Sequence, residues 1–245
     1  NLLTPEVRKL FPTINFDLLI GLPSQNVESI DKTIDEVIKL KPSQIQTMYM
    51  HYKPQTRKYM VRMLRNNPLP DFFDRKAIFD KASKKLLSAG YNRAGFESYA
   101  LPNDPLDKSM KEKKAVYNSL GTQKGEAINF LAVGSSAHGC FGDDYYVQNY
   151  YEQNLYREAI SKGNLPIYRG MKLGDDDKIR RNIVRDIRTY FNLNFKELNE
   201  KHKINFKEYF KKELSFLKEF EDDGLVNLKD DYLQLTELGE HFSPQ

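Results

Sequence analysis

An acidic residue interrupts an apolar run near the start of the chain. Asp17 lies within "INFDLLIG", residues 14–21, and the run ends at a Gly-Leu-Pro turn. Burying a carboxylate without a partner is costly, so an acid inside a strand should either face a pocket or pair with a basic group. In parallel sheets, ligands bind where the carboxyl ends of the strands meet. Asp17 is therefore a candidate ligand contact, and a structural ion pair is the alternative.

Two histidines follow predicted strands and are the next candidates. His138 lies in "AVGSSAHGCFGD", residues 132–143, where small residues would let the backbone approach a ligand closely. His51 follows the strand predicted at residues 44–50. Taken alone, each histidine is more simply explained as a half-buried structural residue. The four histidines show no HxH or HExxH spacing, and the single cysteine, Cys140, excludes a disulfide framework and an all-cysteine metal site within the chain.

A basic pair gives the third group of candidates, within "GDDDKIRRNIVRDI", residues 174–187. The three acids suit the positive N-terminal end of a predicted helix, which explains them without any ligand. That explanation does not cover Arg180 and Arg181, or Tyr168 and Arg169 just upstream. Guanidinium groups form paired hydrogen bonds with carboxylates, so these arginines could receive a carboxylate-bearing ligand.

The elements that must position these residues follow an α/β pattern. Residues 14–20 predict a fully buried parallel strand, and Asn26 is a predicted cap for a helix with apolar residues at helical spacing. Residues 44–50 predict the next strand, so the segment forms a βαβ unit with a parallel sheet. The pattern then predicts these elements: a helix at 74–89, a strand at 93–101, a strand and turn at 126–139, and a helix at 148–162.

The pattern changes at a stretch marked by proline and glycine. We expect one domain at residues 1–162, a linker at 163–174 and a second domain at 175–245. The second domain is predicted to contain helices at 175–191, 194–202 and 205–222, then a hairpin and a closing helix within 224–242. Three helices and a hairpin suggest a winged-helix-like unit of about 70 residues, within the size range of small domains. Acids offset the lysines of its longest helix, which argues against a nucleic-acid reader.

Composition narrows the class of protein further. The 245 residues carry 38 Lys and Arg against 34 Asp and Glu, a net charge of +4 that is too small to indicate a nucleic-acid partner. No apolar run reaches the length of a membrane span, and the first residues do not resemble a signal peptide. We therefore expect a cytoplasmic protein with no membrane partner.

Taken in order, six segments resemble motifs of oxygen-independent coproporphyrinogen III oxidases, which are radical S-adenosylmethionine (SAM) enzymes of haem synthesis. The resemblance covers nearly the whole chain, and "DDDKIRR" and "DGLV" carry its more specific parts. The six segments are "FDLLIGLPSQNVESIDKTI", "YMHYKP", "SYALPNDPL", "AVGSSAHGCFGDDYYVQN", "LPIYRGMKLGDDDKIRRNIV" and the block from "FKEYFKKEL" through "DGLV" to "LTELG".

The resemblance implies part of a radical-SAM (β/α) barrel followed by a winged-helix-like α+β appendage. It implies a SAM pocket at the carboxyl ends of the strands, with Asp17, His51 and His138 as cofactor contacts. It also implies a [4Fe–4S] cluster held by a CxxxCxxC motif, which this sequence lacks. We therefore expect a C-terminal fragment of a protein of about 400 residues or more, by analogy with full barrels. Its cluster ligands would lie in the preceding part, and the fragment alone would be inactive.

The implied activity is oxidative decarboxylation of coproporphyrinogen III propionates to vinyl groups in anaerobic haem synthesis. Its partners would be a tetrapyrrole substrate and an electron donor of unknown identity, and Arg180 and Arg181 are the candidates for propionate contact. His51, Leu120 and His138 depart from the family motifs, which leaves open a related haem-degrading methyltransferase or haem-binding chaperone. A winged-helix nucleic-acid binder is the weaker alternative.

Overall fold

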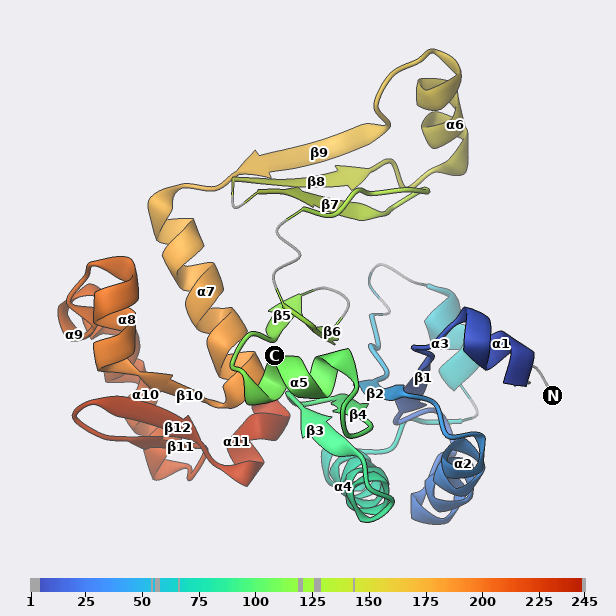
Figure 1. Cartoon of the computed structure of the whole chain (residues 1–245), viewed down its shortest axis with the longest axis horizontal. Coiled ribbons are helices and arrows are strands. Elements are labelled where there is room, and N and C mark those ends of the chain that lie inside the picture. Colours follow the sequence, from blue (N-terminus) through green and yellow to red (C-terminus); the bar gives the residue numbers. More distant parts are fainter. Residues whose placement is uncertain are drawn as a thin grey trace.

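The computed structural model describes residues 5–53, 55, 58–65, 67–118, 121–125, 129–142 and 144–243, with the backbone only at residue 63. Leu120 lies outside these residues, as do parts of the segment 126–139. The described elements follow an α/β order, as the sequence predicts, and they group into a sheet-and-helix layer, a projecting three-stranded sheet and a helical C-terminal unit (Figure 1).

The first layer is a four-stranded sheet in the order β1-β2-β4-β3. Strands β1 and β2 are parallel and joined by α2, which confirms the predicted βαβ unit, whereas β4 pairs antiparallel with both β2 and β3. The predicted single strand at 93–101 is therefore a tight hairpin. The elements are β1 (Asn15–Ile20), α2 (Val27–Leu40), β2 (Gln44–Tyr49), α4 (Phe72–Ser88), β3 (Asn92–Ala94) and β4 (Ser98–Ala100).

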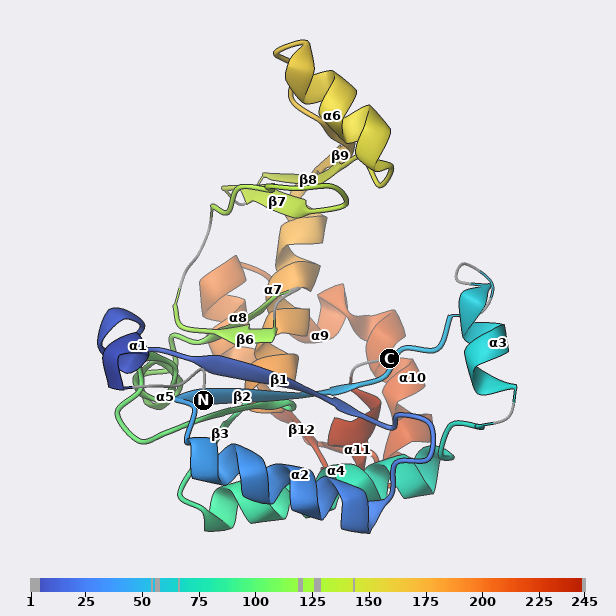
Figure 2. The ribbon, with the colours of Figure 1, turned by 90° about the vertical axis from the view of Figure 1, so that its right-hand side faces the viewer.

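Helices α2 and α4 lie together against one face of this sheet (Figure 2). Asn26 begins α2 as predicted, because its side chain accepts a hydrogen bond from the Ser29 amide in a capping box. Three of its apolar residues recur at helical spacing and are buried: Ile30, Ile34 and Val37. They pack with apolar residues of α4 and of the strands to form the main core.

The other face of this sheet is polar, and here the sequence prediction was wrong. Strand β1 is not fully buried: Asn15, Asp17 and Leu19 are exposed, while Phe16 and Leu18 are half-buried toward the helices. Successive side chains of a strand point to opposite faces, so only every second residue joins the core. An edge strand with one solvated face accommodates an acid without burying it.

The second sheet has the order β7-β8-β9, and it projects from the rest of the molecule with α6 at its far end (Figure 1). Strand β9 falls inside the predicted linker at 163–174, which is therefore an ordered strand antiparallel to β8. Its residues are mostly exposed and show no regular alternation of apolar and polar side chains, so the pattern contains no strand signal. The elements are β7 (His138–Phe141), β8 (Tyr145–Asn149), α6 (Gln153–Ser161) and β9 (Ile167–Lys172).

Helix α7 (Asp175–Tyr190) runs from this projecting sheet to the C-terminal unit (Figure 1). The unit has its own core, and Ile179, Ile183 and Ile187 of α7 pack against it. The helix predicted at 205–222 is divided at Phe210. The elements of the unit are β10 (Asn192–Asn194), α8 (Phe195–His202), α9 (Phe206–Tyr209), α10 (Lys211–Asp222), β11 (Val226–Leu228), β12 (Tyr232–Leu235) and α11 (Glu237–Phe242).

Short elements complete the described chain. The hairpin formed by β5 and β6 lies between α7 and the first sheet (Figure 1), and α7 contacts β5 directly. Tyr190 near the end of α7 donates a hydrogen bond to the Ala115 carbonyl just before this hairpin. The remaining elements are α1 (Pro5–Leu10), α3 (Tyr59–Leu64), α5 (Pro105–Lys111), β5 (Val116–Asn118) and β6 (Gly121–Gln123).

Candidate functional site

The polar face of the first sheet lines a hollow of about 320 Å³. The strand register places Asn15 beside Gln44 and Asp17 beside Gln46. Asp17 therefore faces a pocket, as its position in the sequence predicts. The other lining residues are Ile45 and Met48 of β2, Ser98 of β4, Leu106 of α5, and Thr122 and Gln123 of β6.

Hydrogen bonds fix the side chains that line this pocket. Asn15 donates to Asp17 Oδ1 at 2.6 Å, and Gln44 donates to Asp104 Oδ1 at 2.7 Å. Gln46, only 8% exposed, directs its amide toward Glu97 Oε1 at 3.3 Å. A polar wall held in this way presents its oxygen and nitrogen atoms at set positions, as a ligand site requires.

Glu97 lies next to the pocket, where its carboxyl group contacts the Gln46 amide. Burial raises the pKa of its carboxyl group above the usual range. The hydrogen bond from Gln46 and the nearby basic side chains of Arg188 and His51 oppose that rise, whereas the Asp17 carboxylate reinforces it. Asp17, His51 and Arg188, from three separate segments of the chain, are thus close enough to Glu97 to act on its carboxyl group.

Strand β6 closes the pocket because residue 121 is a glycine. A Cβ atom at Gly121 would lie 2.0 Å from the Gln46 amide nitrogen, and the backbone there has φ +88°, which side chains rarely adopt. The close approach brings Thr122 into the pocket wall. Thr122 is 3% exposed, and its hydroxyl oxygen has no hydrogen-bond partner in the described structure.

Arg188 of α7 closes the other side of the Glu97 neighbourhood. Its guanidinium carbon lies 3.8 Å from the centre of the Tyr117 ring, which holds the side chain by a cation–π contact. Its Nε atom is buried without a hydrogen-bond partner in the described structure. Buried polar atoms are rarely left unpaired, so Thr122 and Arg188 are both consistent with an absent polar ligand.

His138 lies in a second hollow, of about 350 Å³, on the projecting sheet. It is exposed on β7, and the register aligns it with Gln148 of β8 and then Arg169 of β9. Arg169 donates from Nε to Gln148 Oε1 at 2.9 Å. Asp17 and His51 thus share one neighbourhood, and His138 belongs to another.

The basic pair on α7 is divided between two faces of the helix. Arg180 donates to Asp176 at 2.8 Å and to Glu213 at 2.6 Å, and its guanidinium lies over the Phe210 ring of the C-terminal unit. These hydrogen bonds and charges raise the pKa of Arg180 still further. Arg181 lies instead 5.9 Å from the centre of the Tyr146 ring of β8.

Arg181 has companions at helical spacing. Positions 181, 185 and 188 lie on one face of α7, and Arg185 donates to the Tyr146 hydroxyl at 3.4 Å. This face looks toward β8 at one end and toward Tyr117 and Glu97 at the other. Arg180 and Arg181 therefore do not act as a pair, and Arg181 instead shares a helix face with Arg185 and Arg188.

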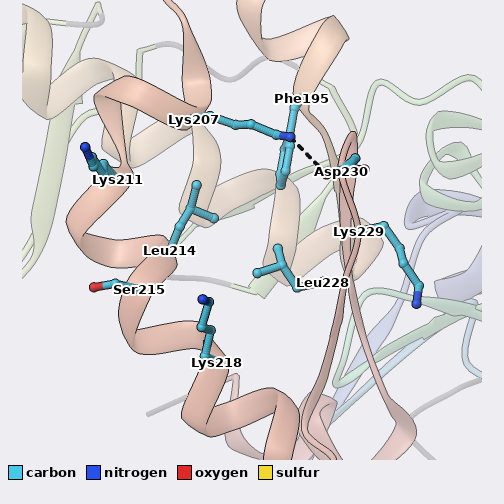
Figure 3. A pocket seen from close by; sticks show the side chains of 9 residues that line it. All are labelled: Phe195, Lys207, Lys211, Leu214, Ser215, Lys218, Leu228, Lys229 and Asp230. Carbon is cyan, nitrogen blue, oxygen red and sulfur yellow. Dashed lines mark hydrogen bonds and ion pairs between the residues drawn. The ribbon is translucent and has the colours of Figure 1, made fainter.

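A third hollow lies in the C-terminal unit between α10 and the β11–β12 hairpin (Figure 3). It is larger, about 550 Å³, and Leu214 and Leu228 face one another across it. The lysines around its rim are Lys207, Lys211, Lys218 and Lys229. Lys207 forms an ion pair at 3.4 Å with the carboxylate of Asp230, which is fully exposed. Such a pair adds little binding specificity.

The part of the chain that the structure describes offers neither a metal centre nor a membrane-spanning helix. The described residues contain no group of three or more metal-ligating side chains. Within them, no helix is both long enough and apolar enough to cross a bilayer.

Two site residues were missed by the sequence analysis. Glu97 had a signal, because it is an acid inside the predicted strand at 93–101, the same feature that selected Asp17. Arg188 had none, since it is one of several arginines on a predicted helix. Only the packing of α7 against β5 brings it to the site.

Comparison with known proteins gives three results. Residues 173–240 match the family model described as the HemN C-terminal domain. The chain is 30% identical over 227 residues to the oxygen-independent coproporphyrinogen III oxidase of Helicobacter pylori, covering 93% of this chain and 49% of that protein. The chain is also 29% identical over 229 residues to the Pseudomonas aeruginosa enzyme of the same name, and this match covers 94% of this chain and 49% of that protein.

The third result is structural. The coproporphyrinogen III oxidase (HemN) of Escherichia coli, described as a radical SAM enzyme, superimposes with a TM-score of 0.85 at 27% identity. The match covers 97% of this chain and 54% of that one. The resemblance seen in the sequence is confirmed, and the chain spans about half the length of the curated relatives named above.

Proposed function

We propose that this chain is the C-terminal half of an oxygen-independent coproporphyrinogen III oxidase. In that reading, residues 1–162 are the later part of a radical-SAM barrel, and residues 175–245 are a winged-helix-like appendage joined to it through β9 and α7. The reaction is oxidative decarboxylation of coproporphyrinogen III propionates to vinyl groups. The observation that carries the proposal is a polar pocket on the sheet of a chain whose fold matches HemN along 97% of its length.

The pocket chemistry fits S-adenosylmethionine. This cofactor carries an ammonium group, ribose hydroxyls, a carboxylate and an adenine ring. Asp17 and Glu97 supply acceptors for the ammonium and hydroxyl groups, and Arg188 supplies a cation for the carboxylate. Met48 and Leu106 give apolar surface, and the unpaired Thr122 hydroxyl is a further polar partner. His51, exposed beside this cluster, is proposed as an additional cofactor contact.

The iron–sulfur cluster does not fit this chain. The sequence has one cysteine, Cys140, which is buried, and the described residues hold no cluster of metal ligands. We therefore place the cluster ligands in the part of the whole protein outside this chain, and this chain alone would be inactive. The chemistry that SAM and the cluster would supply together is hydrogen abstraction from a propionate side chain, before loss of carbon dioxide and an electron.

The substrate propionates would meet arginines between the projecting sheet and the first layer. Arg181 and Arg185 line the α7 face toward Tyr146, and Arg169 lies with His138 in the hollow of the projecting sheet. Guanidinium forks suit carboxylates, so these residues bind and orient the tetrapyrrole. Arg180 is already bonded to Asp176 and Glu213, which favours a structural role for it over propionate contact. His138 is retained as a SAM or substrate contact.

The test uses the whole protein, purified and reconstituted with its cluster without oxygen. It is incubated with SAM, a reductant as electron donor and coproporphyrinogen III, and the products are followed by mass spectrometry with haem as a parallel substrate. Loss of two carboxyl groups from the porphyrinogen supports the proposal. SAM-dependent change of haem without decarboxylation overturns it in favour of a haem-degrading relative. Haem bound without any reaction indicates a haem chaperone.

A further inference from the structure

The last helix of the chain is fastened to the layer that carries the candidate cofactor pocket. Three successive residues of α11 each contact a different part of that layer. Glu240 pairs with Arg93 of β3 at 2.7 Å, and Phe242 stacks on Phe72 of α4 with ring centres 4.9 Å apart. Between them, His241 is buried, with 4% of its surface exposed.

His241 joins the end of β2 to α4. Its Nδ1 atom lies 2.9 Å from the Tyr49 hydroxyl, although the two residues are 192 positions apart in the sequence. Its Nε2 atom lies 3.1 Å from Asp80 Oδ1. A carboxylate only accepts hydrogen bonds, so Nε2 carries the proton and donates to Asp80, and Nδ1 accepts from the Tyr49 hydroxyl.

The groups around His241 favour its neutral imidazole form. Burial lowers the pKa of His241, which favours the neutral imidazole that the two hydrogen bonds require. The Asp80 carboxylate acts the other way and is shared with Lys76 of α4 at 2.6 Å, while Arg93 of β3 adds a second opposing cation. The rings of Phe79 and Phe96 lie edge-on to the imidazole, at 5.2 and 5.3 Å.

Tyr49 is the last residue of β2, the strand along which the pocket lies. Its neighbour Met48 lines the pocket, and the Met50 amide makes the final ladder hydrogen bond, to the Ile20 carbonyl at 2.8 Å. His51 follows immediately and acts on Glu97. Whatever holds the Tyr49 side chain on the helix side therefore sets where residues 48–51 lie on the pocket side.

We propose that His241 is a positioning residue for the cofactor pocket, acting through Tyr49 on the carboxyl end of β2. This inference rests on the proposed function only for the identity of the cofactor, because the link from His241 to the pocket strand is independent of it. It gives the final helix a role at the reaction site, although no residue of α11 lines the pocket.

The test compares His241→Leu with His241→Gln and Tyr49→Phe in the whole protein. Leu removes both hydrogen bonds, whereas one Gln amide can accept from Tyr49 and donate to Asp80. The matched control is His202→Leu, since His202 belongs to the same C-terminal unit and its Nε2 atom is buried without a hydrogen-bond partner among the described residues. The readouts are hydrogen exchange in the peptide covering residues 44–53, the SAM dissociation constant, and the melting temperature.

Loss of a supporting hydrogen bond weakens a site by up to about tenfold. We expect His241→Leu to speed exchange at residues 48–51 and to raise the SAM dissociation constant about tenfold. Tyr49→Phe should do the same, His241→Gln should stay within about twofold of the native protein, and His202→Leu should change neither readout. A lower melting temperature with unchanged exchange at 48–51 would mean that His241 is merely structural, and would overturn the proposal. If the native protein binds no SAM, the proposed function fails, and the exchange data alone decide the role of His241.

Discussion

The polar pocket on the first sheet and the lysine-rimmed groove of the C-terminal unit are both hollows, yet they are built differently. The groove is the larger, at about 550 Å³ against about 320 Å³. In the pocket, the side chains of Asn15, Gln44 and Gln46 are hydrogen-bonded to neighbouring acids. In the groove, among the described residues, Lys211, Lys218 and Lys229 form no side-chain ion pair.

The contrast shows that size does not mark a functional site here. A long lysine side chain on the surface samples many positions, so its charge is not aimed at any one ligand atom. Side chains fixed by hydrogen bonds on neighbouring strands are aimed, and they lose less entropy when a ligand binds.

The largest effect is expected from the pocket acids. Asp17→Asn and Glu97→Gln each remove a charge from the proposed SAM contacts, and hydrogen bonds to charged groups are worth about 1.5–3 kcal/mol. SAM affinity of the whole protein should fall about ten- to a hundredfold in equilibrium dialysis. Asp230→Asn, the matched change at the groove, should leave SAM affinity as it is. Equal losses for all three variants would remove the distinction between the regions.

A smaller difference between the two regions is expected when Gly121 and Gly224 are each replaced by alanine. Gly121 and Gly224 have similar backbone angles, φ +88° and φ +71°, but a Cβ atom meets Gln46 only at Gly121. Both Gly→Ala changes should cost about 1 kcal/mol of backbone strain. Gly121→Ala should lower the melting temperature further and weaken SAM binding, because Gln46 must move. The idea that β6 closes the pocket fails if both variants bind SAM like the native protein.

Acid should destabilise the fold through two histidines, His241 of α11 and His202 of α8. Burial lowers the pKa of His241 and of His202 below the ordinary value of 6.5. The unfolded chain then takes up protons that the folded chain excludes, so stability is full above pH 6.5 and falls as the pH drops toward the lowered values. Denaturant unfolding at several pH values measures this slope. His241→Gln should flatten it, and an unchanged slope would mean that His241 is not neutral in the fold.

The smallest effect is expected from the groove. Lys211→Ala and Lys218→Ala together should change the free energy of unfolding by less than about 0.5 kcal/mol per site, as is usual for surface residues. SAM affinity and porphyrinogen decarboxylation should stay within about twofold. A tenfold loss of either would show that the groove takes part in the reaction, contrary to the contrast drawn above.

The sequence predicted the βαβ unit, the cap at Asn26 and the helices of the C-terminal unit, because each depends on local spacing. It also selected Asp17 and His51, which the structure brings into one neighbourhood. It missed β9, whose exposed residues carry no apolar alternation, and it treated β1 as fully buried, because burial depends on which strands are neighbours.

The arginines show the limit most clearly. Arg180 and Arg181 are adjacent in sequence, but a helix turns successive residues about 100° apart, so they face different partners. Arg188 and Arg169 reach their sites through packing of α7 and pairing of β9. Such contacts join distant segments, and no local pattern encodes them.

The most direct test is hydrogen exchange of the whole protein with and without SAM, read by mass spectrometry. We expect SAM to protect peptides that cover the pocket walls, at residues 15–21, 44–51, 95–101 and 121–125. We expect no change around the groove, at residues 207–218 and 226–232. Protection confined to the groove, or bound SAM without protection at the pocket walls, would contradict the assignment of the cofactor site.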